Sequence, residues 1–190
     1  MRIIAGQFRG RRLASVGKGD AGAHLRPTAD RVRESLFSIL SHMGALEDAV
    51  VLDLFAGTGA LGLEALSRGA QSVTFIDQGR TAQGLIRENI RLTGSAARTR
   101  LLARDATRPG PCEGAPATLV FLDPPYGKDL GEKALGAALT GGWIAGDALV
   151  VWEEAAPQDP PPGFSLLDRR RFGDTHLTFL RCAGPAPVLD

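Results

Sequence analysis

The 190-residue chain contains only two cysteines, Cys112 and Cys182, and their spacing matches no metal-binding or redox motif. We therefore expect no metal site and a reducing, intracellular environment. The sequence also lacks an apolar run long enough to cross a bilayer, and its N-terminus lacks the apolar core of a signal peptide. These absences predict a cytoplasmic protein with no membrane partner.

Repeats and long low-complexity stretches are also missing, and the length suits one domain with at most a short appendage. The net charge of +1 excludes no class of partner, but the charge is unevenly distributed. Residues 1–33 carry eight basic and two acidic side chains, a local balance of +6, so the remainder is net acidic. This asymmetry suggests that the N-terminal end contacts a polyanion, although a solvated basic surface explains it equally well.

The N-terminal region begins with residues 2–13, which predict two short strands around a glycine-containing turn, with arginines at exposed positions. Residues 14–25 are rich in Gly, Ala and Ser and predict a loop. Thr28 follows Arg26-Pro27 and is the expected N-cap of a helix. Apolar residues at helical spacing are expected in the core: Val32, Leu36, Ile39, Leu40 and Met43. The residues expected to lie away from that stripe are Arg31, Glu34, Ser38 and His42.

The remainder of the chain alternates between apolar strands and helical segments. Strands are expected at residues 49–55, 72–77, 100–103, 117–122 and 147–152, and helices at about 60–68, 79–93 and 129–140. Such alternation implies an α/β fold, with a parallel sheet covered by helices on both faces. After the turn-rich residues 157–163, strands at 164–172 and 175–181 joined by Gly173-Asp174 predict an antiparallel hairpin.

A glycine motif lies between the first of these strands and the helix that follows. Gly57, Gly59 and Gly62 fit the pattern G-x-G-x-x-G, which permits a tight turn and close approach of the backbone to a ligand. Asp77 ends the next strand, where an acid can bind both hydroxyls of a ribose. The alternative, that the glycines only ease strand–helix packing, is less favoured. The motif does not distinguish NAD, FAD and S-adenosylmethionine.

Two further acids bear on that choice. Asp53 lies just before the glycine turn, where a carboxylate would repel a pyrophosphate but pair with the α-ammonium of a methionine moiety. Asp105 follows the third strand and can either accept from an adenine amino group or cap a helix that starts at Ala106. Asp53 therefore favours S-adenosylmethionine, whereas both interpretations of Asp105 stay open.

The most specific motif is Asp123-Pro124-Pro125-Tyr126, at the end of the fourth strand. Ligands of open α/β sheets bind at the carboxyl ends of strands. Two prolines fix the backbone and remove two N–H donors, so Asp123 and the nearby carbonyls can accept from an N–H group of a target. Tyr126 supplies a flat face on which a base can stack. The alternative is a proline-rich turn with a buried tyrosine.

These segments resemble the RsmD family of bacterial 16S rRNA guanine-N2 methyltransferases. The resemblance covers nearly the whole chain, at RIIAGQFRGRRL (2–13), RPTADRVRESLFSIL (26–40), DLFAGTGALGLEALSRGA (53–70), FLDPPYG (121–127) and RFGDTHLTFL (171–180). It implies a Rossmann-like class I methyltransferase fold, with a seven-stranded, mostly parallel sheet, an antiparallel C-terminal hairpin, and a short N-terminal β-hairpin and helix. It also implies S-adenosylmethionine as cofactor and 16S rRNA in an assembling small ribosomal subunit as substrate, with no oligomer required.

The resemblance assigns roles by position. The cofactor-binding residues would be Asp53, Phe55, Ala56, Gly57, Thr58, Gly59, Asp77, Gln78, Asp105 and Ala106. The catalytic residues would be Asp123, Pro124, Pro125 and Tyr126. The arginines expected to contact RNA are Arg9, Arg11, Arg12, Arg26, Arg31 and Arg33. The expected divisions are a basic, RNA-contacting hairpin and loop (1–27), the methyltransferase domain (28–183) and a tail (184–190).

The implied reaction is direct transfer of the methyl group to N2 of a guanine that has left its stack. Asp123, if its pKa is ordinary, would be ionised and take the proton that the amine loses. The alternatives are a DNA adenine-N6 or a glutamine-N5 methyltransferase, both of which more often carry Asn in place of Asp123. An NAD-dependent dehydrogenase explains neither the Asp-Pro-Pro-Tyr motif nor the hairpin, which is typical of methyltransferases. Asp123 and Tyr126 argue against an RNA-binding module without catalysis.

Overall fold

The computed structural model describes residues 1–15 and 30–183. Residues 16–25 of the expected loop, the expected N-cap Thr28, the arginine Arg26 and the tail at 184–190 lie outside the described residues. Within the described ranges, no helix is long and apolar enough to cross a membrane.

Seven strands form one sheet in the order β3-β2-β1-β4-β5-β7-β6. The strands are β1 (Val50–Leu54), β2 (Ser72–Ile76), β3 (Thr99–Leu102), β4 (Ala117–Leu122), β5 (Ile144–Glu154), β6 (Phe164–Phe172) and β7 (Thr175–Cys182). Strands β1 to β5 pair in parallel, and β7 pairs antiparallel with both β5 and β6. The predicted parallel sheet with an antiparallel C-terminal hairpin is therefore confirmed.

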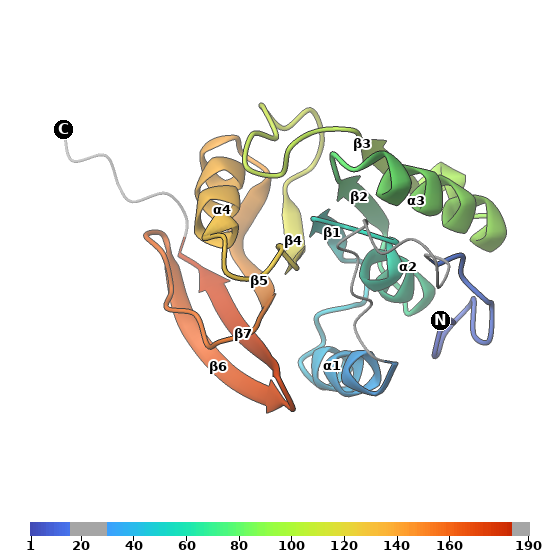
Figure 1. The fold of residues 1–190 in the computed structure, drawn as a ribbon, viewed down its shortest axis with the longest axis horizontal. Coiled ribbons are helices and arrows are strands. Elements are labelled where there is room, and N and C mark those ends of the chain that lie inside the picture. Colours follow the sequence, from blue (N-terminus) through green and yellow to red (C-terminus); the bar gives the residue numbers. More distant parts are fainter. Residues whose placement is uncertain (16–29, 184–190) are drawn as a thin grey trace.

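Helices cover both faces of this sheet, as its apolar strands require (Figure 1). The helices are α1 (Asp30–His42), α2 (Ala60–Ser67), α3 (Arg80–Thr93) and α4 (Leu130–Thr140), with a short 3₁₀ turn, η1, at Ala96–Arg98. Alternate strand residues belong to two hydrophobic clusters. Val51 and Phe121 pack in one cluster with residues of α1, α2 and α3, whereas Leu52 and Leu122 pack in the other with residues of α4.

The N-terminal segment does not form the two strands predicted from its sequence. Its ends approach through one antiparallel bridge, between Arg2 and Arg12. Gly6 and Gly10 both have left-handed backbone angles, so the chain between them turns instead of extending. Glu64 of α2, which is fully buried, holds the segment in place by accepting hydrogen bonds from two of its backbone N–H groups.

Helix α1 forms where it was predicted, but its buried face differs from the predicted stripe. The fully buried residues are Arg33, Leu36, Phe37 and Leu40, and Val32 and Ile39 are half-buried. Met43 was expected in the core and is 42% exposed, because the helix ends at His42. The predicted outward-facing residues are exposed, as expected: Arg31, Glu34, Ser38 and His42.

Candidate active site

A cavity of about 1060 Å³ lies where the strand order reverses, between β1 and β4. In parallel sheets this switch point is the usual ligand-binding crevice, because the flanking loops diverge there. Two groups of predicted site residues share its wall. One group comes from the end of β1 and from the loops after β1, β2 and β3: Asp53, Phe55, Ala56, Gly57, Thr58, Asp77, Gln78 and Ala106. The other group is the loop after β4: Asp123, Pro124, Pro125 and Tyr126.

The glycine loop needs its glycines for two different reasons. Gly59 has a φ of +74°, which is unfavourable for a residue with a side chain. A Cβ atom on Gly62 would lie only 2.5 Å from the ring of Phe75 and 3.1 Å from Oδ2 of Asp53. Phe55 also has a positive φ, of 58°, although it is not a glycine. Such strain in a large side chain is typical of functional loops, and Phe55 faces the cavity.

Asp53 lies at the end of β1 with almost no exposed surface. Its Oδ2 accepts a hydrogen bond from the backbone N–H of Gly62 at 3.0 Å. Burial raises the pKa of Asp53 to about 8, although that hydrogen bond opposes the shift. A carboxyl group held in this state has its pKa lowered again by a nearby cation, so the position suits a positively charged ligand group.

Asp77 follows β2 and faces the same cavity. Its Oδ2 accepts from the N–H of Gly57 at 2.9 Å and its Oδ1 from the N–H of Gly79 at 2.8 Å. Burial raises its pKa, and the two backbone hydrogen bonds oppose that effect. Each carboxylate oxygen can accept more than one hydrogen bond, so Asp77 can still receive a pair of ligand hydroxyls.

Asp105 and Gly59 are the two predicted cofactor residues that are not part of the cavity wall among the described residues. No helix begins at Ala106, so the helix-cap interpretation of Asp105 is wrong. Instead Oδ1 of Asp105 accepts from the backbone N–H and the hydroxyl of Thr107, both at 2.8 Å. This local turn stabilises the loop that brings Ala106 to the cavity.

Asp123 belongs to a cluster of four acids. Its backbone N–H donates to the carbonyl of Leu54 at 3.4 Å, which keeps the end of β4 beside the end of β1. Burial of its carboxyl group, and the negative charges of Glu153, Asp53 and Glu154, raise the pKa of Asp123 well above its ordinary value. The expected ionisation at neutral pH assumed an ordinary pKa, and that assumption is wrong for the site without a bound cation.

Tyr126, in the loop after β4, contacts this cluster of acids. Its hydroxyl donates a hydrogen bond to Oε1 of Glu153 at 3.2 Å. Burial, together with the charges of Glu153 and Asp123, raises the pKa of the phenol above its ordinary value, while a hydrogen bond with Thr175 opposes the shift. The phenol therefore stays neutral at physiological pH, and the residue contributes a ring and a hydrogen bond to the cavity.

Arg33 lies in the cavity wall, not on the surface. Its Nη2 donates to the carbonyl of Arg2 and to Oδ1 of Asp30, but its Nε and Nη1 are buried and have no hydrogen-bond partner within residues 1–15 and 30–183. Burial is the main cause that lowers the pKa of its guanidinium, and the charge of Glu64 opposes the shift. Arg33 faces the cavity and not the outer surface, so the expectation that it contacts RNA is wrong.

The other described arginines that were predicted to contact RNA lie on two different surfaces of the protein. Arg9 and Arg12 are exposed on the N-terminal segment. Arg11 is exposed too, but its Nη1 donates to the carbonyl of Leu92 near the end of α3. Arg31 lies on a different surface, beside β6.

Sequence reasoning missed several residues of this site. Glu153 and Glu154 end β5 and are buried beside Asp123. Polar residues at the carboxyl end of an apolar strand are candidates for a site, and that pattern could have indicated them. Arg33 precedes Leu36, Phe37 and Leu40 at helical spacing, so its burial could also have been predicted.

The comparisons with known proteins agree with this geometry. The chain is 39% identical to the ribosomal RNA small subunit methyltransferase D of Escherichia coli K12 over 161 residues, which are 85% of this chain and 78% of that protein. It is 34% identical to the protein of the same name from Haemophilus influenzae over 178 residues, 91% of this chain and 89% of that protein. The solved structure of yhhF from Escherichia coli superposes with a TM-score of 0.81 at 35% identity, covering 97% of this chain and 99% of that one.

A family model described as Conserved hypothetical protein 95 matches residues 1–181. This match spans the N-terminal segment, the cavity and the C-terminal hairpin together. The chain therefore belongs to the Conserved hypothetical protein 95 family, which is the RsmD family, and has the Rossmann-like fold of S-adenosylmethionine-dependent methyltransferases.

Proposed function

We propose that the protein transfers the methyl group of S-adenosylmethionine to the exocyclic N2 amine of a guanine in 16S rRNA, within an assembling small ribosomal subunit. The observation that carries the proposal is the common cavity of the cofactor motif and the Asp123-Pro124-Pro125-Tyr126 loop. The names of the relatives supply the class of substrate, since both curated relatives described above are small-subunit rRNA methyltransferases.

The residues of the cavity fit the charges of this cofactor. Asp77 would accept the two ribose hydroxyls, and Asp53 would pair with the α-ammonium group. Arg33 would pair with the α-carboxylate, because its buried Nε and Nη1 lack acceptors among the described residues. Asp105 is not in the cavity wall, so it would support the adenine through the turn with Thr107 that brings Ala106 to the cavity. When bound, S-adenosylmethionine supplies an electrophilic methyl group.

The loop after β4 positions the amine that attacks this methyl group. A guanine amine is a weak nucleophile because its lone pair is delocalised into the ring. Asp123 and the carbonyl of Pro124 accept its two N–H groups and turn the lone pair toward the methyl carbon. Tyr126 stacks on the base, and its hydrogen bond to Glu153 fixes the ring.

Asp123 must be ionised to take a proton from the amine, whereas a neutral carboxyl group can still accept the hydrogen bond. Positive charge brought among the four carboxyl groups lowers the pKa of Asp123, so the carboxylate forms in the loaded site. As the N–C bond forms, the bond between the methyl carbon and sulfur would break and leave S-adenosylhomocysteine as a neutral thioether, while the nitrogen would gain positive charge and its proton would become acidic. Asp123 stabilises that charge and takes the proton, which leaves a neutral methylated amine.

The RNA would be held partly by the N-terminal region, residues 1–27, as its excess of positive charge suggests. Arg9 and Arg12 are exposed and suited to phosphate contacts. Arg26 lies outside the described residues, so its contact with RNA is proposed from the sequence alone. Arg11 can contribute only if it exchanges its contact with Leu92.

The test is methyl incorporation from labelled S-adenosylmethionine into three substrates: undermethylated small-subunit particles, free 16S rRNA and duplex DNA. Mass spectrometry of the digested product identifies the modified nucleoside. We expect N2-methylguanosine from 16S rRNA. N6-methyladenine in DNA, or no transfer to any RNA, would reject the proposal in favour of the DNA-modifying or non-catalytic alternatives.

A further inference from the structure

A second hollow, separate from the active-site cavity, lies between α1 and β6. Its volume is about 710 Å³, and its wall includes Arg31, Ser35, Ser38 and Ile39 of α1 together with Arg170 and Phe172 of β6. We call it the α1–β6 groove. We propose that this groove binds the phosphate backbone of the RNA strand that carries the target base, an inference that rests on the proposed function.

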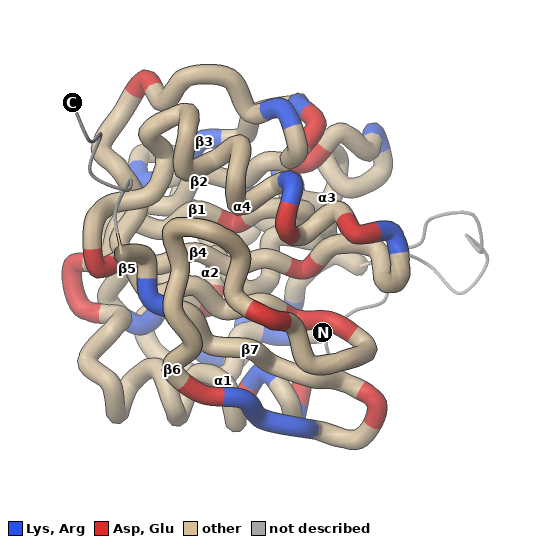
Figure 2. Tube along the Cα trace, turned by 90° about the vertical axis from the view of Figure 1, so that its left-hand side faces the viewer, with Lys and Arg blue, Asp and Glu red and all other residues tan. Residues whose placement is uncertain are grey.

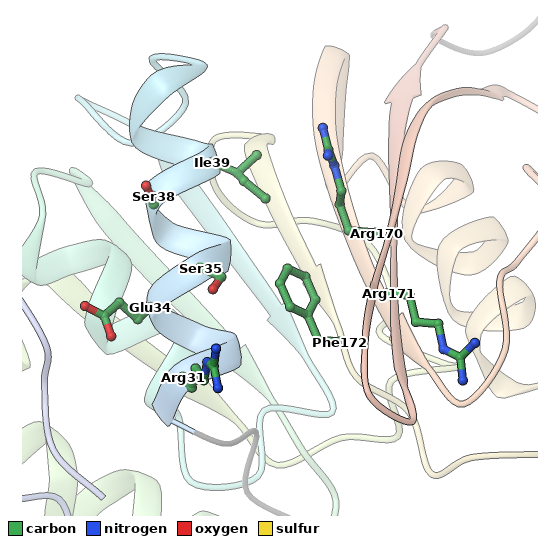
Figure 3. Close-up of a pocket in the computed structure, with 8 residues that line it drawn as sticks. All are labelled: Arg31, Glu34, Ser35, Ser38, Ile39, Arg170, Arg171 and Phe172. Atoms are coloured by element: carbon green, nitrogen blue, oxygen red, sulfur yellow. The ribbon is translucent and has the colours of Figure 1, made fainter.

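The side chains of the groove suit a nucleic-acid backbone. Figure 3 shows Ile39 and Phe172 turned toward each other between the helix and the strand, with Arg31 at the start of the helix and Arg170 on the strand opposite. Ser35 and Ser38 add hydroxyl donors along the same helix. Guanidinium and hydroxyl groups are the usual donors to phosphate oxygens, and a half-buried aromatic ring can contact a sugar or base.

The charge of the groove is positive. Glu34 is the one acid in the wall described here, and in Figure 3 it points away from β6. Arg171 also borders the hollow and leaves the strand in a different direction from Arg170, so it extends the positive surface past the rim. Figure 2 shows these β6 arginines as one continuous basic stretch beside α1.

The guanidinium groups are available to a ligand. Arg31 forms no salt bridge with any residue of 1–15 or 30–183. Arg170 contacts Asp168 through Nε alone, at 2.8 Å, which leaves its two terminal nitrogens for a phosphate. That pair is exposed and therefore weak, so a phosphate can compete for the arginine.

Two short stretches of chain connect the groove with the active-site cavity. On one side, Arg31 of the groove and Arg33 of the cavity wall are two residues apart on α1, on different faces of that helix. On the other side, Phe172 of the groove pairs with Thr175 across the hairpin, and Thr175 contacts Tyr126. A strand whose base enters the cavity beside Tyr126 therefore has its neighbouring phosphates within reach of the groove.

The test compares the wild-type protein with the double variant Arg31→Gln/Arg170→Gln in binding to undermethylated small-subunit particles and to naked 16S rRNA, between 50 and 200 mM salt. Each lost phosphate contact should make the log–log salt dependence shallower by about 0.7, so we expect a change of about 1.4 and an affinity about tenfold or more weaker at low salt. KM for RNA should rise, whereas kcat at saturating RNA and the affinity for S-adenosylmethionine should not change.

Arg169→Gln is the matched control. Arg169 lies on the same strand and carries the same charge, but it is held by Asp159 and the carbonyl of Gln158 and is not in the groove wall. Unchanged affinity and salt dependence in the double variant would overturn the inference, as would an equal loss in Arg169→Gln. A loss confined to particles, with naked RNA unaffected, would assign the groove to a ribosomal protein and also overturn it. RNA binding without any methyl transfer by the wild type would reject the proposed function alone, because binding does not require catalysis.

Discussion

At the scale of single residues, the site depends on a few side chains whose properties differ from their ordinary ones. Asp53 and Asp123 are acids that hold their protons at unusually high pH, and Arg33 is a buried cation with unused donors. Burying these two acids and this cation without a charged partner costs free energy. A ligand that carries both a positive and a negative group would supply a partner to all three side chains.

Asp123→Ala should lower the single-turnover rate of methyl transfer by on the order of 10²–10⁴, the usual range for a group that accepts a proton in the reaction. Asp123→Asn should have an intermediate rate, because it keeps an acceptor but loses the charge. Rapid-quench measurements on 16S rRNA would give both values. Asp129→Asn, an exposed change in the same loop, should have no effect. Wild-type transfer by Asp123→Ala would remove Asp123 from the mechanism.

Arg33→Met should weaken the binding of S-adenosylhomocysteine by roughly 10- to 150-fold, which corresponds to losing about 1.5–3 kcal/mol of charge-assisted hydrogen bonding. The binding of 5′-methylthioadenosine should not change, because this ligand lacks the amino-acid carboxylate. Calorimetric titration of both ligands separates loss of the carboxylate contact from general damage to the cavity.

Two further variants serve as controls for this experiment. Arg33→Lys keeps the charge but not the planar geometry, and it serves if the methionine variant does not fold. Arg31→Met, two residues earlier on α1 and exposed, should bind both ligands as the wild type does. Equal loss of affinity for both ligands in the Arg33 variants would argue against carboxylate recognition.

At the scale of secondary-structure elements, the N-terminal segment is attached to α2 through hydrogen bonds with Glu64 and Ser67. The carboxylate of Glu64 accepts from the N–H groups of Ile4 and Ala5, at 2.8 and 3.1 Å, and from Nε of Arg68 at 2.7 Å. This arrangement satisfies a buried charge completely, which is the condition under which such a charge can stabilise a fold.

Glu64→Gln should therefore lower the free energy of unfolding by about 3 kcal/mol, the lower end of the cost of removing one partner from a buried ion pair. Urea denaturation would measure it. The control is Glu88→Gln, because Glu88 forms an exposed pair with Arg91, and its loss should lower the free energy of unfolding far less. Similar losses in the two variants would mean that Glu64 does not anchor the segment.

The elements themselves were largely predictable from hydrophobic pattern. The predicted ranges of β4 and β6 are the observed ones. A continuous apolar run marks β4, whereas β6 is largely polar and its ends are marked by the turn-rich residues 157–163 and by Gly173-Asp174. Strand β5 was predicted too short because Gly146-Asp147 interrupts its apolar pattern, and Asp147 has a positive φ where the register with β4 shifts. The N-terminal strands were predicted wrongly because alternation of residue types does not report the turns imposed by Gly6 and Gly10.

The acidic cluster was not predictable in the same way. Asp123 and Glu153 are thirty residues apart and meet only because β4 and β5 are neighbours in the sheet. The glycine motif, by contrast, is local, so its position at the cavity could be inferred from one stretch of sequence. The sequence thus indicated where ligands bind, while the ionisation of the site depends on contacts between distant segments.

At the scale of the whole molecule, these ionisations make cofactor binding depend on pH. Without a cation, Asp53 has a pKa of about 8 and is mostly protonated at pH 7. Pairing with the α-ammonium group lowers that pKa, so binding releases a proton and affinity should rise with pH up to about 8. Titration at pH 7 in phosphate and Tris buffers would show the release as a difference in apparent enthalpy. Equal enthalpies, or a release that persists in Asp53→Asn, would contradict this prediction.

The same groups set the pH dependence of stability. The folded-state pKa of Asp53 lies above its unfolded value of about 3.9, so the folded protein binds more protons than the unfolded chain between these two values. The contribution of Asp53 to stability is therefore largest at low pH, falls as pH rises toward about 8, and is constant beyond. Asp123 acts in the same direction. Chemical denaturation of Asp53→Asn across pH 5–9 should show a weaker decline than the wild type.

The position of β6 at one end of the sheet has a consequence for the behaviour of the protein in solution. An edge strand exposes backbone groups on which a strand of another molecule can add, and this is a common start of aggregation. The charged run Asp168–Arg171 disfavours such addition, because a strand that paired with β6 would bury these charges or lie directly against them. Leu166 and Leu167, 42% and 43% exposed on the same strand, have no such protection. Replacing several arginines of β6 would thus leave an aggregation-prone edge strand. The β6 arginines therefore also help to keep copies of the protein from associating.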